Sequence, residues 1–182
     1  MVWLVQFAGF ALLYGAVGSL AFLAILRLFG KGDWRLLPLF FTTLTFVALT
    51  QHPFPDPTTM VCPIKSAAPQ LVPFKFSETF LRLHNNHAPA LKWFMNRTLV
   101  ATAMNFLLCA VIGMALAPHV VTWRSMLAFA FGLTLLVELT QLTGAWGLYP
   151  CAWRQFNVDD LMMNALGVIF GWSWINRMRR ES

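Results

Sequence analysis

The chain has 182 residues, of which 58% are hydrophobic and only 11% are charged. Soluble domains carry roughly 25% charged residues, so this composition excludes an ordinary soluble enzyme and predicts a helical integral membrane protein. The formal net charge is +6, but the basic residues gather at the ends of apolar segments. They are interpreted as topology signals and membrane-surface contacts, and no nucleic-acid partner is expected.

Five apolar segments approach the roughly 20 residues that a membrane-spanning helix needs. The first is interpreted as a retained helix, because its positive charges follow the apolar run instead of preceding it as in a cleavable signal peptide. The second has the shortest apolar core. The sequence predicts one domain over residues 1–182, an all-α integral membrane bundle of about five transmembrane helices. Those helices are expected at residues 3–26, 36–52, 98–117, 125–143 and 158–175.

The distribution of basic residues predicts an orientation in the plasma membrane, because Lys and Arg in short loops favour the cytoplasm. Such residues follow the first helix, precede the fourth and end the chain: Arg27, Lys31, Arg35, Arg124, Arg177, Arg179 and Arg180. The N-terminus is therefore expected outside and the C-terminus in the cytoplasm. The long loop 53–97 and the short loop 144–157 are then external.

The long external loop is expected to carry a short interfacial helix. Ser77 is the predicted N-cap and Glu78 lies in the first turn. Farther along, Trp93 beside Lys92 and Arg97 is typical of the head-group zone of a membrane. Two interpretations remain open, a flap over the outer leaflet and a connector that lies against the bilayer because it is apolar.

Three cysteines are present. Cys109 lies in the middle of the third predicted helix and is interpreted as a small buried hydrophobic residue. Cys62 and Cys151 fall in the two external loops, where an oxidising environment permits a disulfide. A disulfide would tie the two loops together, and two free thiols are the alternative.

Polar side chains converge on the outer half of the last three predicted helices, as judged from a helical rise of about 1.5 Å per residue. Charged groups inside a bilayer are unfavourable, so they usually mark a site or a structural lock. The cluster either clamps the helices together or lines an outward cavity for a polar or anionic head group. An excess of acids over basic partners favours the cavity. The candidate binding residues are Asn105, Glu138, Gln141, Arg154, Asp159, Asp160 and Asn164.

Arg154 and two glycines that follow the cluster carry separate expectations. Arg154 could pair with the acids, and its planar guanidinium also suits a phosphate or a carboxylate. Gly167 and Gly171 continue the face of Asn164, and their four-residue spacing predicts close packing on the fourth or the third helix. No recognised metal-binding motif surrounds the adjacent aspartates, and no metal or cofactor is assigned.

A set of short motifs runs from about Leu71 to Trp172. They are Val72-Pro73-Phe74, Asn105 with Gly113, Glu138-Leu139-Thr140-Gln141-Leu142, the run Arg154 to Asp160, Asn164-Ala165-Leu166-Gly167, and Gly171. With these motifs the chain resembles the VanZ-like family of multi-pass membrane proteins. The departures are Asn157, where the family often has an acid, and Cys109 and Val111 in place of an aromatic residue and a proline. The resemblance implies an association with low-level resistance to teicoplanin, a lipid-bearing glycopeptide.

Three functions are compatible with these features. The favoured one is non-catalytic binding, in the outer leaflet, of a lipoglycopeptide or a lipid-linked cell-wall intermediate, which contributes to glycopeptide resistance. The second is a membrane enzyme acting on a lipid head group, with Glu138 as candidate general base and Asp159 and Asp160 helping to hold a divalent cation. The third is a small transporter, which would require oligomers. No phosphate-binding loop or nucleophile motif supports an enzyme, and the oligomeric state stays open.

Overall fold

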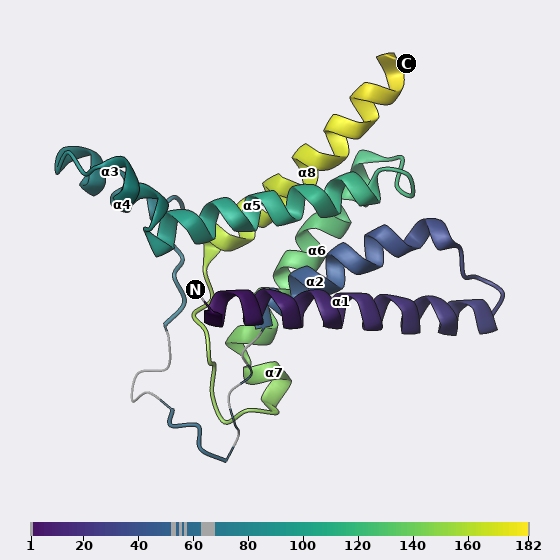
Figure 1. Ribbon diagram of the computed structural model, residues 1–182, viewed down its shortest axis with the longest axis horizontal. Helices are drawn as coiled ribbons and strands as arrows, with labels where there is room; N and C mark the ends of the chain where they lie inside the picture. Colours follow the sequence, from purple (N-terminus) through teal and green to yellow (C-terminus); the bar gives the residue numbers. More distant parts are fainter. Residues whose placement is uncertain (1, 52–53, 55, 57, 63–67, 182) are drawn as a thin grey trace.

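The computed structural model describes residues 2–51, 54, 56, 58–62 and 68–181, and this part of the chain is helical and contains no strand. The long helices are α1 (Val2–Leu28), α2 (Leu37–Gln51), α5 (Arg97–Leu116), α6 (Trp123–Leu142) and α8 (Val158–Glu181) (Figure 1). The predicted helices are confirmed within a few residues at most ends. The exception is α8, which continues beyond Ile175 to Glu181 because the basic residues there are good helix formers.

Three helices are long and apolar enough to cross a membrane: α1, in its Ala8–Leu28 part, α5 and α6. α2 is shorter, with 15 residues, and α8 carries polar residues at both ends. Membrane crossing by these two helices, and with it the count of five, stays a prediction. Large apolar side chains such as Leu13 and Leu136 are exposed on the outside of the bundle, as expected of a lipid-facing surface.

The bundle is organised around α8, which packs along α5 and also contacts α6. α1 packs on α2, and α2 in turn contacts α5 and α6. Buried apolar side chains between these helices form the core, among them Phe46 of α2, Ile112 of α5, Met126 of α6 and Val168 of α8.

Glycines set the close approach of α5 and α8. A Cβ atom added to Gly167 would collide with the carbonyl oxygen of Phe106, and one added to Gly171 would collide with that of Ala110. Gly113 of α5 meets the backbone of α8 in the same way. The packing predicted for Gly167 and Gly171 is therefore made against the third predicted helix, and their small size lets the two backbones touch.

The loop between α2 and α5, predicted to be external, carries two short helices, α3 (Phe76–Asn85) and α4 (Ala90–Phe94), which extend beyond the end of α5 and away from α1 and α2 (Figure 1). The prediction that Ser77 caps α3 is wrong. α3 begins at Phe76, and the N-cap position belongs to Lys75, whose side chain makes no capping hydrogen bond. The carboxylate of Asp159 in α8 accepts the Phe76 N–H instead. This acceptor lies 83 residues away in the sequence, so no local sequence pattern predicts it.

Candidate functional site

A side-chain hydrogen bond joins α5 to α8 in the polar cluster. The Asn105 Nδ2 atom donates to the Asp160 Oδ1 atom at 3.0 Å, so two of the predicted residues meet directly. Asn164 follows Asp160 one turn deeper on α8 and is only 1% exposed. These residues lie between packed helices, where a satisfied polar pair favours one arrangement of the helices.

Glu138 connects α6 to the segment that precedes α8. It is 2% exposed, and its Oε2 atom accepts the backbone N–H of Asn157 at 2.9 Å. Glu138 also interacts electrostatically with Asp160 and with Arg154. Its carboxylate therefore orients the start of α8 relative to α6.

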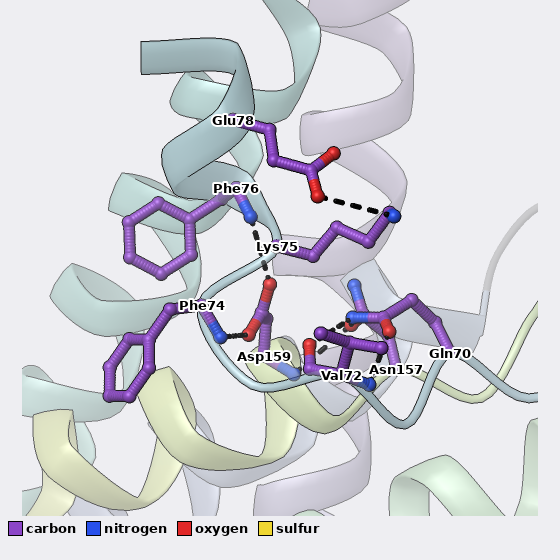
Figure 2. A network of polar contacts seen from close by, with 8 residues as sticks. All are labelled: Gln70, Val72, Phe74, Lys75, Phe76, Glu78, Asn157 and Asp159. Carbon is purple, nitrogen blue, oxygen red and sulfur yellow. Dashed lines mark hydrogen bonds and ion pairs between the residues drawn. The ribbon is translucent and has the colours of Figure 1, made fainter. Parts of the chain in front are cut away.

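Asp159 holds the external loop through both of its carboxylate oxygens. The backbone N–H groups of Phe74 and Phe76 donate to Oδ1 and Oδ2, the second at 3.0 Å (Figure 2). Asp159 is 3% exposed, so water does not compete strongly for these bonds. Hydrogen bonds to a carboxylate are among the strong ones in proteins. The carboxylate predicted to bind a ligand is engaged by the protein's own backbone.

Asn157 and Gln70 complete the contact between Asp159 and the loop before α3, which is called the junction here. Neither was predicted as a site residue. The Asn157 Oδ1 atom accepts the N–H of Asp159 at 3.0 Å and the side-chain amide of Gln70 at 3.3 Å. The backbone of Gln70 pairs with Phe156 and Val158 in an isolated parallel bridge. The Asn157 bond is an N-cap of α8, which the Asn-x-Asp pattern could have revealed. For Gln70 the sequence offers no comparable signal.

Gln141 belongs to a different contact. Its Nε2 atom donates to the Thr50 carbonyl of α2 at 2.8 Å, and Gln51 of α2 donates to the Val137 carbonyl of α6 at 3.3 Å. The two glutamines thus make reciprocal bonds between α2 and α6. The structure does not bring Gln141 to the junction with Asp159, although both lie toward the same end of the bundle.

Arg154 lies in the loop before α8 and its side chain is exposed. Partial desolvation lowers the pKa of its guanidinium, while the negative charges of Asp160 and Glu138 act in the opposite direction. The arginine therefore interacts electrostatically with both acids, and its positive charge offsets theirs.

A disulfide joins Cys62 to Cys151, with the two Cα atoms 6.0 Å apart. It ties the long external loop to the loop between α6 and α8, as the sequence allowed. Cys109 is a buried free thiol in α5, in agreement with its interpretation as a small core residue. The loop before α3 is thus attached covalently at Cys151 and through hydrogen bonds at Asp159 and in the bridge between Gln70 and Asn157.

A cavity of about 260 Å³ lies beside this junction, between α3, the first turns of α5 and the segment before α8. Asp159 is the predicted binding residue that lines it, and Asn157 and Gln70 line it as well. The remaining polar lining comes from Lys75, Glu78, Thr79, Thr98, Thr102 and Gln155.

The lining of the cavity is close to neutral. Lys75 and Glu78 form an exposed ion pair with an N–O distance of 3.4 Å across α3 (Figure 2). The hydroxyls of Thr79 and Thr98 take no part in the hydrogen-bond network among the described residues. Over the same part of the chain, no group of three or more His, Cys, Asp or Glu residues could hold a metal ion. The arrangement suits hydrogen bonding to a polar group of modest charge.

The family model described as VanZ/LLP1 matches residues 34–179, which include the junction, the cavity and the helices from α2 to the last turn of α8. Comparisons with curated proteins and with solved structures found no match. The matched region covers most of the chain, and the chain belongs to the VanZ-like family of membrane proteins.

Proposed function

We propose that this protein binds an amphiphilic envelope ligand in the outer leaflet without changing it chemically. The ligand is a lipoglycopeptide antibiotic or a lipid-linked cell-wall intermediate, and binding contributes to teicoplanin-type resistance by reducing access of the drug to its target. The observation that carries this proposal is the polar cavity beside α3. The cavity is lined mostly by polar residues, and the segment between its lining residues Gln70 and Lys75 carries the exposed apolar side chains Leu71, Val72 and Phe74. This combination suits a ligand with a polar head and an apolar tail.

The proposal includes an orientation, with the N-terminus outside and the C-terminus in the cytoplasm. The basic residues after α1 and at the end of α8 support it. The disulfide supports it independently, because Cys62 and Cys151 would then face an oxidising compartment. Labelling of Thr59→Cys by a membrane-impermeant thiol reagent in intact cells is the test. Labelling only after the cells are opened would show the opposite orientation and contradict this part of the proposal.

The contacts of the acids favour binding over catalysis. Both oxygens of Asp159, one oxygen of Glu138 and one of Asp160 accept hydrogen bonds from the protein. A general base or a metal ligand needs an oxygen that is available to the substrate or the ion. Asp159 has both oxygens engaged, and Glu138 and Asp160, which each have a second oxygen, are not part of the cavity lining. Head-group chemistry in the cavity is therefore the less favoured function.

The experiment measures binding to the purified protein in lipid nanodiscs. Teicoplanin, its deacylated form and a lipid-linked cell-wall intermediate are titrated separately. We expect saturable binding of at least one acylated ligand and weaker binding of the deacylated form, because the tail no longer contacts the leaflet. Absence of saturable binding by folded protein that still confers resistance in cells would contradict the proposal.

Two isosteric substitutions locate the binding site. Thr79→Val and Thr98→Val each remove a hydroxyl from the cavity while keeping its shape. One lost hydrogen bond corresponds to about 1 kcal/mol, so each variant should weaken binding by about fivefold. Thr140→Val is the matched control, because its hydroxyl bonds within α6 to the Leu136 carbonyl and lies outside the cavity lining.

A further inference from the structure

The two short helices of the external loop form a small unit of their own, called the arm here and comprising residues 76–97. The rings of Phe80 in α3 and Trp93 in α4 meet edge to face with their centroids 4.9 Å apart. The indole N–H of Trp93 donates to the Ala88 carbonyl at 3.1 Å. The chain reverses between the two helices at His87, which has a φ of 46°. The arm therefore has a defined internal geometry.

The arm exposes its apolar side chains instead of burying them. Leu91 is 67% exposed and Phe94 is 80% exposed. Phe80, Leu81 and Met95 are also more than half exposed. Several large apolar residues crowded onto one short element mark a surface that contacts another apolar phase.

The arm carries more basic than acidic side chains. Arg82, Lys92 and Arg97 are exposed basic residues, and the single acid, Glu78, is paired with Lys75 just before the arm. Helices that combine a basic character with exposed apolar residues lie in the interface of anionic membranes. Charge complementarity thus points to anionic lipid head groups as the partner.

The position of the arm fits such a surface. α4 ends at Phe94 and α5, a candidate membrane span, begins at Arg97, so the arm joins the bundle where that span leaves the membrane. Figure 1 shows α3 and α4 extending beyond this end of α5, away from α1 and α2.

We propose that the arm rests on the outer leaflet, with Leu81, Leu91 and Phe94 inserted at the acyl boundary and its basic side chains bound to anionic phospholipid head groups. α3 also lines the cavity through Phe76, Glu78 and Thr79. The arm consequently holds the cavity at the level of the head groups, and an amphiphile enters it sideways from the leaflet. This inference rests on the proposed orientation, and it stands whether or not the cavity binds an antibiotic.

The test places an environment-sensitive fluorophore on single cysteines introduced into the full chain. Leu81→Cys and Leu91→Cys report on the two helices of the arm, and Thr59→Cys, exposed in the external loop, is the aqueous control. The native disulfide is retained, and the buried Cys109 is replaced by alanine. Each labelled protein is reconstituted in nanodiscs of phosphatidylcholine with and without phosphatidylglycerol.

We expect nitroxide lipids to quench both arm labels, and aqueous iodide to quench the Thr59→Cys label in preference. Phosphatidylglycerol should strengthen the lipid quenching of the arm. Arg82→Gln with Lys92→Gln should lower the preference for phosphatidylglycerol by about fivefold per charge removed. Iodide quenching of the arm labels equal to that of the control would overturn the proposal. An unchanged lipid preference in the charge variant would overturn its anionic-lipid part.

Failure of this test and failure of the proposed function are distinguishable. Antibiotic binding is measured by titration of nanodiscs, whereas the position of the arm is measured by quenching without any antibiotic. An arm that lies in water while the ligand still binds would remove the sideways entry route and leave the binding proposal intact. An arm that lies in the leaflet while no ligand binds would contradict the binding proposal and leave the proposed position of the arm intact.

Discussion

Two adjacent carboxylates, Asp159 and Asp160, perform different tasks at the two sides of α8. Asp160 turns toward α5 and accepts from the side chain of Asn105. Asp159 turns outward and accepts from the backbone of the external loop at Phe74 and Phe76. Successive residues of a helix point about 100° apart, so neighbouring acids face different partners. One acid joins two helices and the other attaches a loop.

Removal of Asp159 should have the largest effect. Asp159→Ala leaves two N–H groups without their acceptor, and hydrogen bonds to a charged group contribute about 1.5–3 kcal/mol each. We expect the loop around Phe74 to exchange amide hydrogens at least a hundredfold faster, with the helices of the bundle still protected. Hydrogen exchange followed by mass spectrometry measures this. Glu78→Ala, which removes an exposed acid of α3, is the control and should change little.

The bond between α5 and α8 should show as a coupling between two substitutions. Asn105→Ala and Asp160→Ala are expected to destabilise the bundle by about 1–2 kcal/mol each, and the double variant by less than their sum. Denaturant unfolding of the four proteins gives the coupling energy. Simple additivity would mean that this pair does not hold the helices. Loop exchange at Phe74 should stay slow in all of them.

A substitution at Gln141 tests a contact between helices that does not involve the cavity. Gln141→Ala should lower stability by about 1 kcal/mol, because the Thr50 carbonyl of α2 loses its donor. Ligand affinity should stay unchanged, since this contact faces α2 and not the cavity lining. A weakened affinity at equal stability would place Gln141 in the binding site, as the sequence suggested.

The cavity hydroxyls should have the smallest effect on stability. Thr79→Val and Thr98→Val change no hydrogen bond of the junction. The free energy of unfolding, measured by thermal unfolding, should therefore change by less than about 0.5 kcal/mol. The fivefold loss of ligand affinity expected of each variant would then reflect binding alone. A large loss of stability would show that these hydroxyls support the fold.

The sequence predicted the helices well because long apolar runs are directly visible in it. It also predicted that Asn105 and Asp160 lie in the same half of the bundle, and the two side chains are bonded. Depth alone does not fix direction around a helix, however, and so Gln141 was grouped with Asp159 and Asp160 although its side chain bonds to α2. Backbone partners were the harder part. The N–H groups of Phe74 and Phe76 carry no side-chain signal, and Ser77 resembled a cap more than Asp159 did.

One measurement distinguishes the role of the hydrogen-bonded acids from the role of the cavity. It compares the proposed teicoplanin resistance of cells that carry Glu138→Gln with that of cells that carry the Thr79→Val and Thr98→Val double variant, at equal expression. The glutamine can still accept the Asn157 N–H through its carbonyl oxygen, so this hydrogen bond persists. We predict that Glu138→Gln retains resistance and that the threonine double variant loses most of it. Loss of resistance in folded Glu138→Gln, with resistance intact in the threonine variant, would contradict the account and favour catalysis by Glu138.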